Sequence, residues 1–202
     1  MPLRFKSEPL DVKEIVTKRL GQMGQKGFRI PRLAKTIAEE GEQILVPVHG
    51  MPVFQIGLND LAKGGTIDVA KQTGWRYLLE HKNSVIASTE TVLGPEQKHH
   101  FAAVTEGPLV QGTVSAIKAA DSLKEISTGE YEVRLLLVPA LYAMALWLVN
   151  LQKGSDLAIP ISPAPPYMTP NKIISLNDLL SLLQKEAKAL VENQLGIEPV
   201  GG

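Results

Sequence analysis

The sequence predicts an α+β fold, with an antiparallel sheet of about five strands, three helices packed against it, and a helical hairpin at the amino terminus. Three observations lead to this prediction. Several short runs alternate apolar and polar residues with the two-residue period of a strand. Other segments repeat apolar residues at helical spacing behind a capping residue or a proline. An uncharged stretch of fifteen residues, from Leu135 to Val149, marks the centre of the core.

The amino-terminal segment predicts the helical hairpin. Asp11 and Glu14 have the spacing of a capping box, and apolar residues follow at helical spacing, so we expect a first helix from Val12 to Met23. Glycines then interrupt the pattern. Because proline suits the first turn of a helix, a second helix is expected from Pro31 to Glu40, and Gly41 should end it.

Residues 43–57 predict two short extended segments that are joined by a turn at His49 to Met51. Pro47 and Pro52 favour sheet edges or irregular extended chain, because proline cannot donate a hydrogen bond to a central ladder. A short helical turn from Leu58 to Gly65 is expected to follow.

Three strand-like runs come next and predict an antiparallel meander. The first two are separated by four residues, His81 to Ser84, which suits a hairpin loop. A polar loop that contains Gly94 and Pro95 leads to the third run. The runs are Trp75 to Glu80, Val85 to Val92 and His99 to Thr105.

The uncharged stretch should change structure at Pro139, since proline has no amide hydrogen and disfavours helix in the residue before it. Glu130 to Val138 alternates at first and then becomes wholly apolar, which predicts a central strand. Ala140 to Leu151 is rich in Ala, Leu and Met, which predicts a central helix. A helix of fifteen residues would cover about 22 Å of a hydrocarbon layer of ~30 Å, so no membrane span is predicted.

Two helices and one strand complete the predicted core. A helix from Pro108 to about Leu123 precedes the central strand, and a short strand from Leu157 to Ile161 follows the central helix. The last helix should start at Ser175, with Asp178 at the capping-box position and a stripe of leucines facing the sheet. The helices expected on the sheet are therefore 108–123, 140–151 and 175–194.

The composition is that of a globular protein. Hydrophobic residues make up 44% of the chain and charged residues 21%, which excludes wholesale disorder and coiled-coil or collagen architectures. The chain has no cysteine, so it can form neither a disulfide nor a thiol nucleophile. The first residues lack the apolar core of a secretory signal, and we expect a cytoplasmic protein.

A chain of 202 residues can hold one core with a small appended subdomain. We expect residues 1–68 to form an amino-terminal helical and extended subdomain, and residues 69–202 to form the α+β core domain. One continuous domain is the alternative.

The segment from Ser162 to Pro170 holds four prolines in nine residues and should be stiff and extended. A preformed extended segment that carries an aromatic residue loses little entropy when it docks onto a partner. The alternative is that this loop only crosses the sheet and that its tyrosine fills the core. The candidate partner-binding residues are Pro165, Pro166, Tyr167 and Met168.

The amino-terminal hairpin carries a basic bias, because residues 1–35 contain nine basic and three acidic residues. Arg29, Arg32 and Lys35 lie at the start of the second helix, where a helix-turn-helix would face phosphates or base edges. The linker is longer than the usual three or four residues, and acidic residues follow the basic ones. A solvated basic face is therefore the favoured interpretation, and nucleic-acid binding is the alternative.

Other motifs do not point to a known chemistry. His99 and His100 are adjacent on a strand and should point to opposite faces, one half-buried and one in solvent, so no metal site is predicted. Lys63 to Thr66 contains the residues of a phosphate-binding loop but not their order. No serine lies in a Gly-x-Ser-x-Gly elbow. No cofactor is predicted, and the missing motifs argue against an enzyme without excluding one.

The leading functional hypothesis is therefore a non-enzymatic protein-interaction or regulatory module. Its support is the absence of catalytic motifs, the balance of 21 basic and 21 acidic residues, and the proline loop. A protein partner or a homo-oligomer fits this hypothesis. The alternatives are nucleic-acid binding through the amino-terminal hairpin, and an enzyme whose small-molecule pocket forms only in three dimensions.

Overall fold

The structure is a computed structural model that describes residues 3–6, 9–23, 30–41, 45–122 and 129–195. Its strands are β1 (Leu3–Phe5), β2 (Val46–Gln55), β3 (Lys71–His81), β4 (Ser84–Leu93), β5 (His99–Thr105), β6 (Tyr131–Val138), β7 (Ala143–Asn150), β8 (Leu157–Pro160) and β9 (Ile174–Ser175). Its helices are α1 (Leu10–Met23), α2 (Pro31–Glu40), α3 (Leu58–Ala62), α4 (Pro108–Asp121) and α6 (Leu176–Leu195), with short 3-10 turns at η2 (Ile67–Val69) and η3 (Pro139–Leu141).

All nine strands belong to one mixed sheet, ordered β5-β4-β3-β2-β6-β7-β8-β9, with β1 also paired to β6. The chain is α+β, but the predicted sheet is wrong. An antiparallel sheet of about five strands with three helices and a separate hairpin would lack β1, β2, β7 and β9. It would also be antiparallel throughout, whereas β1 and β2 both run parallel to β6. The predicted meander of β3, β4 and β5 is confirmed.

The largest error is the central helix predicted over 140–151. Pro139 starts the short turn η3, which ends at Tyr142 in the left-handed conformation, and the chain returns as β7 antiparallel to β6. Residues 145–148 are all buried. A run that is apolar on both strand faces is also apolar around a helix, so the pattern could not separate the two. The helix preference of Ala, Leu and Met is weaker than the ladders that β7 forms with its two neighbours.

A second error concerns β2, which was expected as two segments with a turn between them. His49 adopts a φ of 53°, and the register with β3 shifts between Val48 and Met51, so the chain forms a bulge within one strand. β2 also lies inside the sheet, although it contains two prolines. β2 pairs with β6 only through residues 53–55, and both prolines come before this segment. The hydrogen bonds between β2 and β6 therefore do not require an amide hydrogen from either proline.

The amino- and carboxy-terminal helices follow their sequence signals. α1 and α2 lie close to the predicted bounds, and Gly41 ends α2 with a φ of 83°. α6 begins after Ser175, whose hydroxyl accepts a hydrogen bond of 3.0 Å from the amide of Asp178. α4 runs to Asp121, and the predicted residues beyond Ser122 lie outside the described residues.

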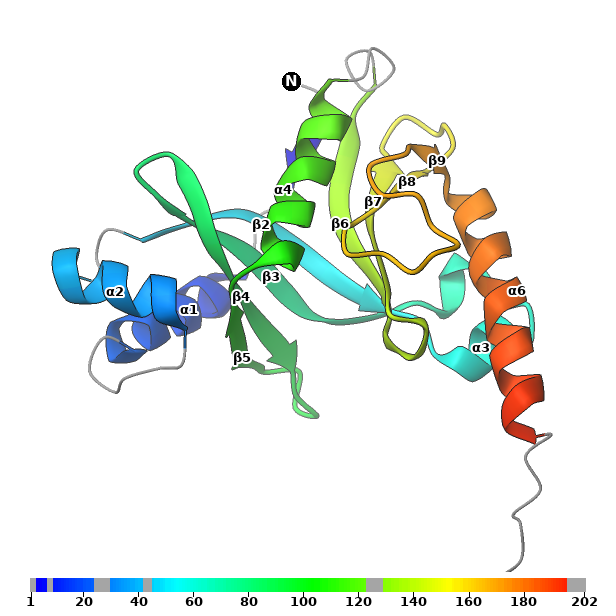
Figure 1. Ribbon diagram of the computed structural model, residues 1–202, viewed down its shortest axis with the longest axis horizontal. Helices are drawn as coiled ribbons and strands as arrows, with labels where there is room; N and C mark the ends of the chain where they lie inside the picture. The colour runs from blue at the N-terminus through cyan, green and yellow to red at the C-terminus, as the bar shows by residue number, and fades with distance from the viewer. Residues whose placement is uncertain (1–2, 7–8, 24–29, 42–44, 123–128, 196–202) are drawn as a thin grey trace, which may run out of the picture.

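Helices cover both faces of the sheet (Figure 1). α4 packs on one face, over Leu78, Leu135 and Leu146. On the other face, α1 and α2 cover the β3–β4 end through Trp75 and Tyr77, and α6 covers the β6–β8 end. β2 belongs to the first 68 residues, and it pairs with β3 and β6 of the remaining chain. The domain boundary at residue 68 stays a prediction. No helix in the described ranges is both long and apolar enough to cross a membrane.

Candidate functional site

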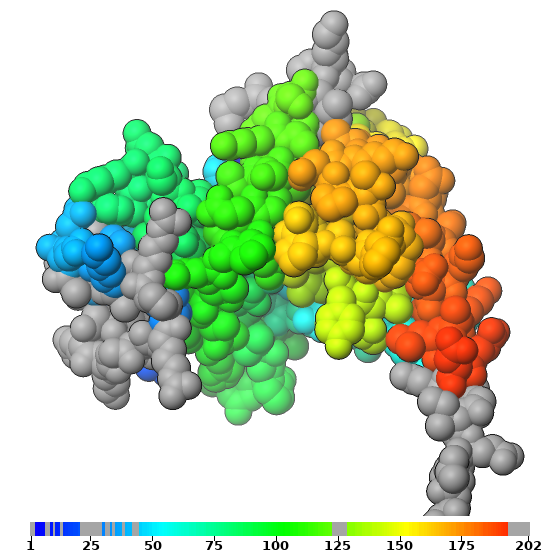
Figure 2. Space-filling view, in the orientation of Figure 1, coloured from blue at the N-terminus to red at the C-terminus, as the bar shows by residue number. Residues whose placement is uncertain are grey.

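A groove of about 740 Å³ lies where the β6–β7 turn, the loop 163–166 and the start of α4 meet. In Figure 2 it is bounded by the lime turn, the yellow and orange loop and the green helix. Every residue that lines it is apolar or aromatic. They are Leu109, Leu137, Pro139, Leu141, Tyr142, Ala143, Met144, Pro163, Ala164, Pro165 and Pro166. No charged side chain of the described residues lines this groove.

The β6–β7 turn presents Tyr142 beside this groove. The amide of Tyr142 donates a hydrogen bond of 3.0 Å to the carbonyl of Pro139, which closes the turn. Tyr142 itself has a φ of 51°, a conformation that bulky residues seldom adopt. Its side chain is 88% exposed. The turn therefore holds a large aromatic ring in solvent next to an apolar groove.

The proline loop divides its four predicted partner-binding residues between two places. Pro165 and Pro166 line the groove. Tyr167 is half-buried, and its hydroxyl donates a hydrogen bond of 3.0 Å to the carbonyl of Leu141. Met168 is only 5% exposed and packs in the core beneath α6. Two of the four residues can thus meet a partner, and the other two anchor the loop.

Burial raises the pKa of the Tyr167 hydroxyl, and the charge of Glu186 raises it further. The hydroxyl is therefore a hydrogen-bond donor across the neutral range. Because it joins the proline loop to the β6–β7 turn, it fixes the two walls of the groove relative to one another.

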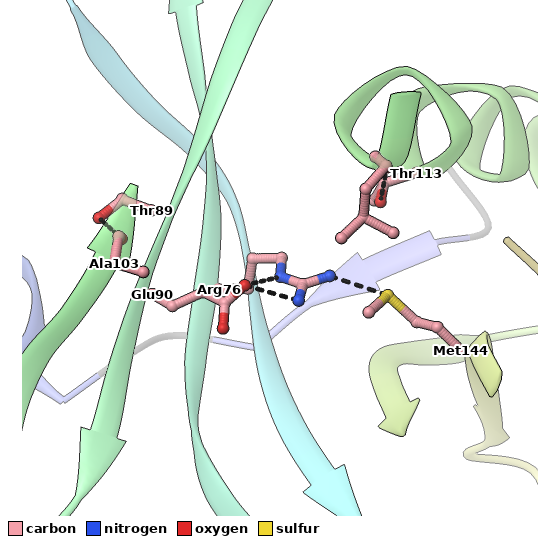
Figure 3. Close-up of polar contacts among 7 residues, drawn as sticks. Arg76, Thr89, Glu90, Ala103, Thr113 and Met144 are labelled. Carbon is pink, nitrogen blue, oxygen red and sulfur yellow. Dashed lines mark hydrogen bonds and ion pairs between the residues drawn. The ribbon is translucent and has the colours of Figure 1, made fainter. Parts of the chain in front are cut away.

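An ion pair between Arg76 and Glu90 contacts Met144, a residue of the groove (Figure 3). Arg76 is 3% exposed, and its Nε and Nη2 lie 2.7 and 2.6 Å from Oε1 of Glu90. Its Nη1 lies 2.9 Å from the sulfur of Met144, a residue that lines the groove. The sequence does not reveal this pair, because it depends on the register in which Arg76 of β3 faces Glu90 of β4.

A second hollow, of about 410 Å³, lies between α4, the β3–β4 hairpin and the bulge of β2. Figure 2 shows this depression between the teal hairpin and the green helix, with a small cyan area of β2 at its base. Apolar side chains of β3, β4 and α4 form part of its lining, and six polar side chains complete it. The polar residues are His49, Asn83, Ser84, Gln111, Lys118 and Asp121.

His49 owes its place in this hollow to the bulge. Its ring contacts Phe5 of β1, with 4.4 Å between the ring centroids. Partial burial lowers the pKa of His49, and the carboxylates of Asp121 and Glu80 oppose that effect. The imidazole is therefore mainly neutral at neutral pH. Sequence reasoning interpreted this segment as a turn and missed the side chain as a site residue.

Of the three residues predicted to bind nucleic acid, only Lys35 has a described side chain, so this site stays a prediction. Arg29 lies outside the described residues, as does the side chain of Arg32. Lys35 is exposed on α2, and its Nζ lies 3.8 Å from Oε1 of Glu39. Basic side chains gather elsewhere, in a hollow of about 450 Å³ that includes Lys18 and Arg19.

This basic hollow lies between α1 and the edge strand β5. Its other lining residues are Ile15, His99, His100 and Phe101, so it contains no carboxylate. The guanidinium of Arg19 lies 5.8 Å from the ring centroid of Phe101. His99 is half-buried and His100 is exposed, and both line this hollow.

The described part of the chain contains no cluster of three or more His, Asp or Glu side chains that could hold a metal ion. Its distinctive surfaces are the apolar groove, the mixed hollow under α4 and the basic hollow at α1. The apolar groove and the hollow under α4 share no lining residue. Comparison with protein-family models, with curated proteins and with solved structures gives no match.

Proposed function

We propose that this chain is a protein-interaction module whose apolar groove holds large apolar side chains of a partner segment. The observation that carries the proposal is the exposed ring of Tyr142 beside a groove whose lining is wholly apolar or aromatic. Tyrosine and methionine are enriched at the cores of protein interfaces, and a few such residues supply most of the binding energy. Contiguous exposed apolar surface of this kind marks interaction sites.

The proline wall determines how a partner would bind. Pro163, Pro165 and Pro166 have no amide hydrogen, so this wall offers only the amide of Ala164, too few donors for the ladder that an added strand requires. A partner would therefore bind through its side chains. The volume of about 740 Å³ lies within the range of roughly 300–1,000 Å³ that is typical of pockets for small ligands, and it has room for a few large side chains.

The groove is also preorganised. Proline restricts its own backbone, and the Tyr167 hydroxyl ties the loop to the turn at Leu141. On the other side, a Cβ atom at Gly112 of α4 would lie 1.8 Å from the carbonyl oxygen of Ser162, so helix and loop are in close backbone contact. A rigid site loses less conformational entropy on binding, which favours affinity.

The test is selection of peptides from a displayed library on the wild-type protein, followed by measurement of Kd for each selected peptide. We expect peptides with two or more large apolar residues, and affinities that change little with salt because no charge lines the groove. Tyr142→Ser and Ala164→Glu should each weaken binding about tenfold or more.

Leu151→Ser is the matched control, because Leu151 is an exposed apolar residue outside the groove. It should leave the affinity unchanged. Peptides that bind the Ala164→Glu protein as tightly as the wild type, or a library that yields no binder, would contradict the proposal.

Nucleic-acid binding is a second candidate, and the basic hollow at α1 favours it. Lys18 and Arg19 face this hollow beside Phe101, a combination that suits a phosphate and a stacked base. Such binding should weaken steeply as salt increases, because phosphate contacts release counterions. A DNA affinity that does not change with salt, or with Lys18→Glu, would eliminate this candidate. The salt response therefore separates the two candidates.

A further inference from the structure

The hollow under α4 combines an apolar lining with charges of both signs. Leu78, Val85, Val114 and Ile117 supply the apolar part. Lys118 and Asp121, both on α4, supply one positive and one negative charge. The volume of about 410 Å³ is at the lower end of the range of roughly 300–1,000 Å³ for small-molecule sites. A ligand that fits would be small, partly apolar and polar at one end.

Lys118 and Asp121 are neighbours on α4, yet their side chains do not form an ion pair with one another. Lys118 and Asp121 are three residues apart on one helix, where Cβ atoms lie about 5–6 Å apart. Neither side chain forms a hydrogen bond or an ion pair with another described residue. A lysine that precedes its acidic neighbour along a helix is also the less favourable order for pairing. Both charged groups are therefore available to a ligand.

The backbone beside these charges is held in an uncommon conformation. His49 has a φ of 53° within the bulge of β2, and Asn83 has a φ of 61° in the β3–β4 turn. The value at Asn83 is ordinary for a two-residue hairpin turn, whereas that of His49 within a strand is unusual, and residues of the latter kind concentrate at binding and catalytic sites. The bulge places the imidazole of His49 in the lining, opposite α4. Gln111 donates its side-chain amide to the carbonyl of Val85, which ties α4 to the β3–β4 hairpin beside the hollow.

We propose that this hollow binds a free α-amino acid with an apolar side chain. Lys118 binds the carboxylate, Asp121 binds the ammonium group, and the apolar lining of Leu78, Val114 and Ile117 holds the side chain. The proposal does not depend on the function assigned to the apolar groove, because the two sites share no lining residue.

Charge complementarity selects this ligand class. A simple anion would attract Lys118 but would also face the carboxylate of Asp121, and a simple cation would meet the opposite problem. A purely apolar molecule would leave both charges and the polar lining without partners. A zwitterion satisfies both charges. Its two charged groups are bonded to one carbon atom, so the side chains of Lys118 and Asp121 must converge on the ligand from the same helix face.

The test is isothermal titration of the full chain with L-leucine and with two analogues that each lack one charge. L-Leucinamide lacks the carboxylate, and 4-methylpentanoate lacks the ammonium group. We expect saturable binding of leucine at millimolar concentration, and binding of each analogue at least tenfold weaker, because each loses a charge-assisted hydrogen bond. Glycine should also bind more weakly, since it has no side chain for the apolar lining.

Two variants test which group of the ligand each side chain binds. Lys118→Gln should abolish the preference for leucine over leucinamide, and Asp121→Asn should abolish the preference for leucine over 4-methylpentanoate. Both residues are exposed, so the fold should tolerate these changes. Lys185→Gln is the matched control, because Lys185 is an exposed helical lysine on α6 outside the hollow, and it should alter neither preference.

Amide chemical-shift mapping gives a readout that does not depend on variants. Leucine should shift resonances of β2 near His49 and of α4 between Val114 and Asp121. The proposal is overturned if leucine does not saturate, if both analogues bind as well as leucine, or if the shifts map to another surface.

Discussion

Tyr142 illustrates how a single backbone conformation creates a surface. Its left-handed φ of 51° costs about 1 kcal/mol for a residue with a Cβ. The turn keeps this conformation because Pro139 fixes the preceding backbone and accepts the closing hydrogen bond. Because β6 and β7 pair in register up to Val138 and Ala143, the ring can only point outward from the end of the hairpin. The short turn fixes the backbone from which this exposed ring projects, which suits an interface.

Tyr167 predicts how stability responds to alkaline pH. Its pKa is raised in the folded state, so the unfolded chain loses this proton first as pH rises above about 10. The stabilisation from the hydroxyl is present below that pH and is lost above it. At pH 8, Tyr167→Phe should lower the free energy of unfolding by about 1 kcal/mol, since it removes the hydrogen bond to Leu141.

Urea unfolding of the wild type and of Tyr167→Phe at several pH values measures this difference. The difference in unfolding free energy between the two proteins should narrow as pH rises above about 10. Other tyrosines titrate in both proteins and cancel in the comparison. A gap that stays constant or widens with pH would show that the hydroxyl does not act as the buried donor described here.

The ion pair of Arg76 and Glu90 leads us to expect that replacing one partner destabilises the fold more than replacing both. Arg76→Met would leave the carboxylate of Glu90 without its partner, at a cost of about 3 kcal/mol. This value is at the low end for buried pairs, because Glu90 is 26% exposed. Arg76→Met combined with Glu90→Met removes both charges and should recover at least half of the loss. Urea unfolding of the wild type, of Arg76→Met and of the double variant measures these differences in the free energy of unfolding.

The exposed pair of Lys98 and Glu96 is the control for this experiment. Both side chains are more than 70% exposed, at 72% and 75%. Lys98→Met should therefore change stability by less than about 1 kcal/mol. If Arg76→Met were equally mild, the buried pair would not support the groove.

At the scale of elements, the contact between α4 and the proline loop predicts the effect of Gly112→Ala. Alanine favours helix over glycine by about 1 kcal/mol, so an ordinary helical site would gain stability. Here the added Cβ would lie 1.8 Å from the carbonyl oxygen of Ser162, and either the helix or the loop must move. We expect a net loss of about 1–3 kcal/mol in thermal or urea unfolding.

The same substitution should weaken peptide binding, because α4 and the loop form two walls of the groove. Ser115→Ala, at an exposed position on α4, is the control and should be neutral within about 0.5 kcal/mol. A Gly112→Ala protein as stable as the wild type would show that helix and loop are not in firm contact.

Elements with local signals could be predicted from the sequence. α2 and α6 have a proline or a capping serine at their starts, and the hairpin between β3 and β4 has a short polar turn. β7 could not be predicted, because its apolar residues fit a buried helix as well as a buried strand. Only its pairing with β6 and β8 determines that the segment is a strand. β1 has three residues and carries no periodic signal of its own.

The candidate sites likewise divide into parts with a local sequence signal and parts that depend on the tertiary structure. The proline loop could be found from composition, and two of its four predicted residues line the groove. The opposite wall was missed, because it exists only when residues 139–144 form a turn and a strand instead of a helix. The hollow under α4 could not be found from the sequence at all. It requires the bulge at His49 and the approach of α4 to the β3–β4 hairpin, as in the hydrogen bond between Gln111 and Val85, which are 26 residues apart.

At the scale of the whole molecule, one sheet connects two helical ends. Trp75 is buried with α1 and α2, whereas Trp147 is buried with α6. Between them β2 pairs with β3 on one side and with β6 on the other. A sheet interior cannot lose one of its strands without leaving backbone groups of both neighbours unpaired, which is costly where they are buried. The two ends should therefore unfold together.

The two tryptophans allow this to be measured, because each reports on one end. In Trp147→Phe the remaining Trp75 follows the α1 and α2 end, and in Trp75→Phe the remaining Trp147 follows the α6 end. In each variant we expect the midpoint of urea unfolding from fluorescence to equal the midpoint from far-ultraviolet circular dichroism, as two-state unfolding requires. Comparing two signals within one variant avoids errors from the different stabilities of the variants. If the Trp75 signal changed at lower urea than the circular dichroism, the amino-terminal end would unfold by itself, and β2 would not couple the two halves of the sheet.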